Sequence, residues 1–299
     1  MATNGFIPKT GLTLGVIGCG NMAGAILSGV MDSCAKTQES GEEPRIARFI
    51  ATVNSEGSAK RAKNRFAKYS DRFEVVQGEN VTAMKEADVV ILGFKPYMID
   101  LVLRVEGVRE ALAGKLVISV LAGSPVEKLH SAIFRNGPKT EEERPFFIKR
   151  AMMNMAAEYG ESMTVLETNP DIPKEYEDLT EWMFSQLGKI APVAPELYDV
   201  AGVMAGASGA LLSIAFDGML DGAVSQGMKR ADANKILTQS LISLVTLLQH
   251  EHPAVLREKF SSPKGTTIAG LLSLEEDRAR YAYSKATIAS SERSKEIGK

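Results

Sequence analysis

Short apolar runs alternate with helical stretches over the first part of the chain. The run Leu12–Ile17 ends in Gly18-Cys19-Gly20, which is typical of a buried parallel strand followed by a tight turn. Further strands are predicted at 48–53, 73–76, 89–94, 116–121, 146–151 and 163–166, helices at 21–31, 58–66, 80–86, 97–112 and 173–187, and a polar loop at 36–44. This alternation predicts an α/β fold with a doubly wound parallel sheet.

The pattern changes at Pro195, after which no strand is predicted. Segments 196–226 and 232–249 are long, apolar and rich in Gly, Ala and Ser. A helix that is apolar all round must be buried, and a domain of about a hundred residues has little interior to bury it. We therefore expect domain 1–194 to hold the sheet, and domain 195–299 to be all-helical and to interlock with a second copy. The residues that cover nearly the whole circumference of the first helix are Leu211, Leu212, Ile214, Ala215, Phe216, Met219, Leu220 and Ala223.

Composition and charge narrow the class of protein. With 299 residues, 44% of them hydrophobic and 24% charged, the chain has the composition of a soluble globular protein. A net charge of −2 provides no basic field for nucleic acid or an anionic membrane. The N-terminus lacks the apolar core of a signal peptide, and the apolar stretches are interrupted before the roughly 20 residues that span a membrane. We expect a cytoplasmic protein without nucleic-acid or membrane partners.

Cysteines and histidines predict no metal site. The two cysteines, Cys19 and Cys34, provide neither a disulfide framework nor a metal cluster, and they fit a reducing compartment. His250 and His252 flank Glu251 in a predicted turn, without a third ligand nearby.

A glycine-rich turn follows the first strand. The pattern Gly18-x-Gly20-x-x-Ala23 opens the first helix and matches the dinucleotide fingerprint in its Gly/Ala form. Its glycines let the backbone approach a pyrophosphate, which then lies at the helix N-terminus. A bare structural turn is the alternative, but the strand–turn–helix context favours a Rossmann cofactor domain.

The end of the second strand indicates which nicotinamide cofactor is bound. NAD enzymes usually place a carboxylate there to bind the ribose hydroxyls. This chain has Asn54 and Ser55, with Lys60 and Arg61 about a turn later, which favours the 2′-phosphate of NADPH. The two cations could equally form a solvated helix face, and Glu56 keeps NADH possible.

Two other loops are expected at the same sheet edge, because ligands of open α/β sheets lie across the carboxyl ends of the strands. Gly93-Phe94-Lys95-Pro96 ends the fourth strand, and Val120-Leu121-Ala122-Gly123 ends the fifth. Lys95 could contact a phosphate or ribose, or be an ordinary loop lysine.

A second polar segment lies in the helical domain. Residues 261–267 carry hydroxyls, Pro and Gly directly before an apolar helix. Such a segment ordinarily caps a helix, but free N–H groups at a helix N-terminus also bind a small carboxylate. The residues alone favour capping.

Nearly the whole chain resembles the pyrroline-5-carboxylate reductase family. The matching segments are Gly18-Cys19-Gly20-Asn21-Met22-Ala23, Lys95-Pro96, Ser119-Val120-Leu121-Ala122-Gly123, Asn154 with Glu161-Ser162-Met163-Thr164, and, most specifically, His252-Pro253, Leu256-Arg257 and Ser262-Pro263 through Gly265-Thr266-Thr267-Ile268-Ala269-Gly270-Leu271. The resemblance implies that NAD(P)H gives hydride to the imine carbon of 1-pyrroline-5-carboxylate and forms L-proline. It also implies interlocked C-terminal helices in a homodimer, sometimes in larger rings.

The resemblance also assigns site residues. The implied cofactor-binding residues are Gly18, Cys19, Gly20, Asn21, Met22, Ala23, Asn54, Ser55, Asn80, Gly93, Phe94, Lys95, Pro96, Val120, Leu121 and Ala122. The implied substrate-binding residues are Ser262, Pro263, Lys264, Gly265, Thr266 and Thr267, and the Thr267 hydroxyl faces the imine nitrogen.

The chain departs from the family pattern near the expected substrate. The usual Ser-Gly-Ser-Gly-Pro-Ala is Ala205-Gly206-Ala207-Ser208-Gly209-Ala210, the usual Met-Pro-Asn-Thr-Pro is Met152-Met153-Asn154-Met155-Ala156, and the usual Gly-Gly is Lys264-Gly265. A methylated pyrroline or piperideine carboxylate is therefore an alternative substrate, and a non-catalytic NADP-binding sensor is an alternative function. A β-hydroxyacid dehydrogenase is disfavoured, because no lysine lies between Glu196 and Met228.

Overall fold

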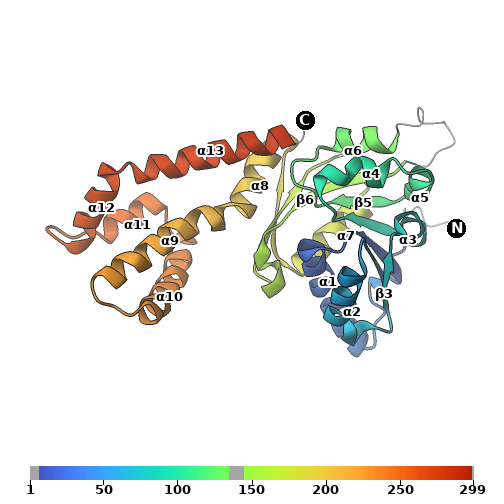
Figure 1. Cartoon of the computed structure of the whole chain (residues 1–299), viewed down its shortest axis with the longest axis horizontal. Coiled ribbons are helices and arrows are strands. Elements are labelled where there is room, and N and C mark those ends of the chain that lie inside the picture. The colour runs from blue at the N-terminus through green and yellow to red at the C-terminus, as the bar shows by residue number, and fades with distance from the viewer. Residues whose placement is uncertain (1–6, 135–144, 298–299) are drawn as a thin grey trace. The chain divides into compact units, whose positions relative to one another are not determined.

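A computed structural model describes residues 7–134 and 145–297 (Figure 1). Its eight strands form one sheet in the order β3-β2-β1-β4-β5-β6-β7-β8, in which every neighbouring pair is parallel except β6 and β7. The doubly wound, mostly parallel sheet predicted from the sequence is therefore confirmed. The strands are β1 (Leu12–Ile17), β2 (Ile46–Val53), β3 (Phe73–Gln77), β4 (Val89–Leu92), β5 (Leu116–Ser119), β6 (Phe147–Met152), β7 (Ser162–Glu167) and β8 (Gly188–Val193).

Helices cover both faces of the sheet. Neighbouring strand residues point to opposite sides, so that apolar strands give the sheet two apolar faces to cover. In β4, Val89 and Ile91 join one apolar cluster, with α1 (Asn21–Glu39) and α7 (Lys174–Ser185). Val90 and Leu92 join the other cluster. The helices of that second cluster are α3 (Asn80–Glu86), α4 (Ile99–Leu103), α5 (Val108–Leu112) and α6 (Val126–Ile133), and α2 (Glu56–Arg65) follows β2.

Several predicted elements are corrected. The helix expected at 97–112 is divided into a 3₁₀ turn, η2 (Pro96–Met98), followed by α4 and α5, because Gly107 adopts a left-handed conformation with φ +87°. The loop expected at 36–44 begins later, since α1 continues to Glu39. The sequence prediction missed α6 and β8, and did not foresee that β7 is antiparallel to β6; a short turn, η3 (Met155–Tyr159), joins these strands without a crossover.

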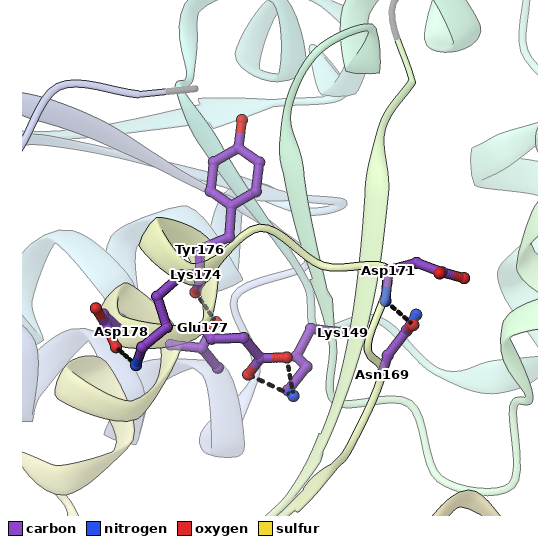
Figure 2. Close-up of polar contacts among 8 residues, drawn as sticks. Lys149, Asn169, Asp171, Lys174, Tyr176, Glu177 and Asp178 are labelled. Atoms are coloured by element: carbon purple, nitrogen blue, oxygen red, sulfur yellow. Dashed lines mark hydrogen bonds and ion pairs between the residues drawn. The ribbon is translucent and has the colours of Figure 1, made fainter. Parts of the chain in front are cut away.

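Polar contacts fix α7 against the sheet (Figure 2). Lys149 on β6 is buried, and its ammonium group lies 2.7 Å from both carboxylate oxygens of Glu177. The Tyr176 hydroxyl donates to the Gly114 carbonyl at 2.7 Å, and burial is the main cause that raises the pKa of this phenol to about 12. These side chains hold the helix in place and lie apart from the cavity described below.

The chain forms two compact units, 1–206 with 291–299, and 207–290. From Pro195 to Ile297 the described residues contain helices and turns only, which confirms the predicted all-helical C-terminal region. The boundary at 194/195 remains a prediction. The helices are η4 (Pro195–Leu197), α8 (Tyr198–Gly206), α9 (Ser208–Ser225), α10 (Arg230–Leu248), α11 (Pro253–Lys259), α12 (Thr266–Glu276) and α13 (Ala279–Ile297).

The stretch Pro195–Ser225 differs from the sequence expectation. It has the length and, with a mean hydropathy of 1.5, the composition of a helix able to cross a membrane, and only 11% of its most apolar part is buried. The sequence pattern predicts that Gly, Ser, Gln or charged residues interrupt the longest apolar stretches before they reach that length. Within this segment the acidic residues are Glu196, Asp199, Asp217 and Asp221. So much exposed apolar surface requires an apolar partner.

Candidate functional site

A cavity of about 290 Å³ opens at the carboxyl ends of β1, β2 and β4. The strand order reverses between β1 and β4, which is where open α/β sheets bind their ligands. Eight residues predicted to bind the cofactor line this cavity: Gly18, Cys19, Gly20, Asn54, Asn80, Gly93, Phe94 and Lys95. The structure therefore brings together loops that are far apart in the sequence.

Two of the glycines are required by close packing. Gly18 has φ +88°, and a Cβ there would lie 2.8 Å from the Cα of Phe94. A Cβ on Gly93 would lie 2.8 Å from the Cβ of Ala23. The loops after β1 and β4 therefore touch, and neither position accepts a side chain without movement.

Gly20 has a different role, because no atom lies within 4 Å of a Cβ built there. It is the N-cap residue of α1, and it makes no side-chain cap bond. The first N–H groups of a 19-residue helix thus meet open space beside a glycine. This arrangement fits a pyrophosphate, so the chain's own residues suit a dinucleotide.

Thr52 and Ser58 also line the cavity, although neither is among the predicted site residues. Thr52 is buried near the end of β2; its hydroxyl accepts a hydrogen bond from the Gly18 N–H at 3.1 Å, and its carbonyl accepts one from the Cys19 N–H at 2.9 Å. It therefore fixes the glycine loop. A single hydroxyl in the otherwise apolar stretch Phe49–Val53 was the available signal.

Ser58 belongs to a polar cluster at the start of α2. Ser55 caps this helix by accepting from the Ser58 N–H at 3.3 Å, and the two hydroxyls lie 3.0 Å apart. The Arg61 guanidinium donates to the Ser58 hydroxyl at 2.7 Å. This exposed cluster of hydroxyls and a cation, without a carboxylate at the end of β2, suits a phosphate group better than ribose hydroxyls.

Cys19 remains a neutral thiol in the cavity. Burial raises its pKa to about 11, and the positive charge of Arg65 only partly opposes that effect. The loop therefore carries no thiolate that would repel a phosphate at neutral pH.

The other predicted cofactor residues lie outside the cavity lining. Asn21, Met22 and Ala23 begin α1, Ser55 caps α2, and Pro96 begins η2. Val120, Leu121 and Ala122 follow β5 at the same sheet edge, and the Val120 N–H donates to the Leu92 carbonyl at 3.1 Å. Their contact with a cofactor remains a prediction.

The segment 262–267 belongs to the second compact unit. The Gly265 N–H donates to the Ser262 carbonyl at 3.0 Å, which closes a turn in which Lys264 has φ +58°. Gly265 is the N-cap residue of α12 and supplies no side-chain cap bond. The exposed Thr267 hydroxyl and the first N–H groups of this 11-residue helix are therefore available to a small anion.

His252 has a structural role in the second unit. The His252 side chain caps α11 by accepting from the Ala254 N–H at 3.2 Å. Within residues 7–134 and 145–297, no group of three or more His, Cys, Asp or Glu side chains is arranged to hold a metal ion.

Comparisons with known proteins match both regions. A family model described as pyrroline-5-carboxylate reductase dimerisation matches residues 195–297, and one described as NADP oxidoreductase, coenzyme F420-dependent, matches residues 13–123. Pyrroline-5-carboxylate reductases of Lophium arboricola and Neurospora crassa are 36% and 34% identical; the alignments cover 96% and 92% of this chain and 94% and 90% of those proteins.

A solved structure supports the same fold. The Plasmodium falciparum pyrroline carboxylate reductase with NADP bound has a TM-score of 0.78 at 21% identity, covering 96% of this chain and 98% of that one. The Rossmann cofactor region, the helical dimerisation region and the identity over almost the full length lead to one conclusion. The chain belongs to the pyrroline-5-carboxylate reductase family of nicotinamide-dependent oxidoreductases.

Proposed function

We propose that this protein reduces the cyclic imine 1-pyrroline-5-carboxylate to L-proline with NADPH. The observation that carries the proposal is 36% identity to a pyrroline-5-carboxylate reductase over 96% of the chain, in a protein that retains the cavity at the carboxyl edge of the sheet. The reaction adds a hydride to the imine carbon and a proton to the nitrogen.

The cofactor supplies the hydride when bound, and the protein positions it. The Gly18–Gly20 backbone and the N-terminus of α1 receive the pyrophosphate, and Lys95 adds a positive charge at the cavity. In the second unit, the uncapped N-terminus of α12 and the 262–267 turn hold the substrate carboxylate. The Thr267 hydroxyl donates a hydrogen bond to the imine nitrogen, and the proton comes from solvent.

We propose NADPH as the preferred cofactor because Ser55, Ser58 and Arg61 form a phosphate-type cluster. The preference over NADH is modest, since Glu56 lies in the first turn of the same helix. Arg61→Ala is expected to lower the ratio of kcat/KM for NADPH to that for NADH about tenfold, and Lys63→Ala, an exposed cation further along α2, leaves it unchanged. A wild-type ratio that favours NADH contradicts this part of the proposal.

We also propose a homodimer formed through residues 195–297, located in the cytoplasm. As its binding partner the protein takes a small cyclic imino acid, and it binds neither nucleic acid nor a membrane. The match of this region to a dimerisation model supports the assembly.

A related cyclic imine is the second candidate substrate. The Asn154 amide donates to the Ala205 carbonyl at 3.0 Å, which joins two segments that depart from the family pattern. Met155, next to Asn154, is 79% exposed and offers an apolar contact in place of a hydroxyl.

NADPH consumption with a panel of imines tests these proposals. The panel contains 1-pyrroline-5-carboxylate, a methylated pyrroline carboxylate and a piperideine carboxylate. We expect the highest kcat/KM with the first. Faster reduction of another member would reassign the substrate, and NADPH binding without any turnover would make the protein a sensor.

A further inference from the structure

The last turns of α13 lie against the loop that follows β5. Gly123 in this loop has φ +60°, and a Cβ there would lie 2.8 Å from the Ile297 Cβ and Cγ2 and 2.9 Å from the Ser294 carbonyl oxygen. Both segments belong to the first compact unit. The backbone of the loop at Gly123 therefore packs directly against the Ile297 side chain and the Ser294 carbonyl, and a side chain at position 123 would not fit.

The end of α13 is itself held in place. The Ser294 hydroxyl donates to the Asp199 carboxylate on α8 at 2.7 Å, and Ser291, one turn earlier, is buried. In Figure 1 the C-terminal end of α13 lies beside α8. Tyr198 in turn fixes α8, because the centroid of its ring lies 3.9 Å from the guanidinium carbon of Arg150.

The loop also connects to the cofactor cavity. Its first residue, Val120, donates from its N–H to the Leu92 carbonyl at 3.1 Å. Leu92 directly precedes Gly93, Phe94 and Lys95, which line the cavity. The loop is thus held at one end by the strand that carries cavity residues, and at the other end by α13.

We propose that Ser294 and Ile297 are positioning residues that keep the Val120–Gly123 loop in the conformation that receives the cofactor. This inference rests on the proposed function and on the prediction, drawn from the family resemblance, that Val120, Leu121 and Ala122 bind the cofactor. A loop fixed before binding loses less conformational freedom when the ligand arrives, so affinity is higher. The dimerisation model reaches residue 297, so the helix that ends the dimerisation region also supports the cofactor site.

The dissociation constant for NADPH, measured by fluorescence titration of the full-length protein without any imine, tests this proposal. Ser294→Ala and Ile297→Gly are each expected to raise Kd about three- to tenfold, because each releases one contact of the loop support. The matched control is Glu292→Ala, an exposed position on the same turn, and its Kd should not change. Light scattering confirms that all three variants assemble like the wild type.

A double-mutant cycle separates positioning from a general loss of stability. Gly123→Ala is expected to weaken NADPH binding, because its Cβ displaces the loop or the helix end. Ile297→Gly removes two of the three atoms that this Cβ meets. In the double variant the increase in Kd should therefore be smaller than the product of the two single increases.

The possible failures are distinguishable. Unchanged Kd in Ser294→Ala and Ile297→Gly, or fully multiplicative effects in the cycle, would overturn the positioning role even if the enzyme reduces 1-pyrroline-5-carboxylate normally. Tight NADPH binding without turnover would overturn the proposed function and leave the positioning role intact.

Discussion

The two compact units use apolar residues in opposite ways. In the first unit every residue of β4 and β5 is buried, and two apolar clusters cover the two faces of the sheet. In the second unit no residue of α9 (Ser208–Ser225) or α12 (Thr266–Glu276) is buried within the single chain, although both helices are largely apolar. The first unit therefore completes its core alone, whereas the second needs surface from another molecule.

Buried charge in the first unit offers the largest expected effect. Arg150 lies 2.9 Å from Glu167, and both are buried. Arg150→Ala leaves a carboxylate without its partner and should lower the free energy of unfolding by about 3–5 kcal/mol in urea denaturation. Arg48→Ala, which breaks the exposed pair with Glu74 and Glu86, should cost at most about 1 kcal/mol. Equal losses in the free energy of unfolding for the two variants would contradict the conclusion that the first unit completes its core alone.

The same variant has a predicted pH dependence. Burial raises the pKa of Glu167, and Arg150 opposes that rise. Without Arg150 this pKa should rise further above the unfolded value of about 4.3, so the folded state binds the proton more tightly. The stability deficit of the variant relative to wild type should therefore shrink as pH falls toward the unfolded pKa of about 4.3. The deficit should grow as pH rises through the folded pKa of Glu167. A pH-independent difference would argue against a buried carboxylate.

A matched pair of exposed apolar residues tests the second unit. Ile214 on α9 is 71% exposed and Leu101 on α4 is 70% exposed. Ile214→Glu places a charge in the expected dimer interface and should weaken self-association by about a hundredfold or more. Leu101→Glu should leave assembly unchanged and alter stability by less than about 0.5 kcal/mol. Light scattering over a dilution series measures both, and equal behaviour would remove the distinction between the units.

The sequence predicted the sheet and the glycine loop because both follow from short-range patterns. Apolar runs marked the strands, and Gly18, Gly20 and Ala23 identified the turn. β8 escaped prediction because Pro192 interrupts its pattern, which an edge strand tolerates. The antiparallel β7 depends on where the chain returns after η3, and no local residue pattern states that.

The site was predicted less completely than the fold. Thr52 acts through a contact with the Gly18 loop, which is distant in the sequence, whereas Ser58 acts through contacts with Ser55 and Arg61 at the start of its own helix. The contact of Gly123 with Ile297 joins a loop in the middle of the chain to the last helix, which periodicity cannot reveal. The residues alone favoured a capping role for 261–267, and Gly265 of this segment stands at the N-cap of α12; substrate binding by the segment remains a prediction.

A substitution of Thr267 tests whether the start of α12 takes part in the reaction. Thr267→Ala should lower kcat/KM by roughly tenfold or more, because it removes a hydrogen bond to the imine nitrogen, and NADPH binding should not change. Ser273→Ala, an exposed position later in α12, serves as the control. Wild-type turnover, with a loss of about 1 kcal/mol of stability, would return Thr267 to a role in the helix start.

A further prediction concerns the reactivity of Cys19 in the first unit. Its pKa, raised from 9.0 to about 11, lowers the thiolate fraction at neutral pH roughly a hundredfold. Alkylation by iodoacetamide should therefore be slow, should speed up as pH rises toward 11, and should slow further with NADPH. Rapid labelling at neutral pH would show that the cavity is more open to water than its burial indicates.

Light scattering of the wild type, with activity assayed at the same concentration, tests the central claim most directly. The account predicts a mass of at least twice 32.3 kDa in every active sample at micromolar concentration, because α9 and α12 bury their apolar surface only against a second copy. A fully active monomer of 32.3 kDa would contradict it.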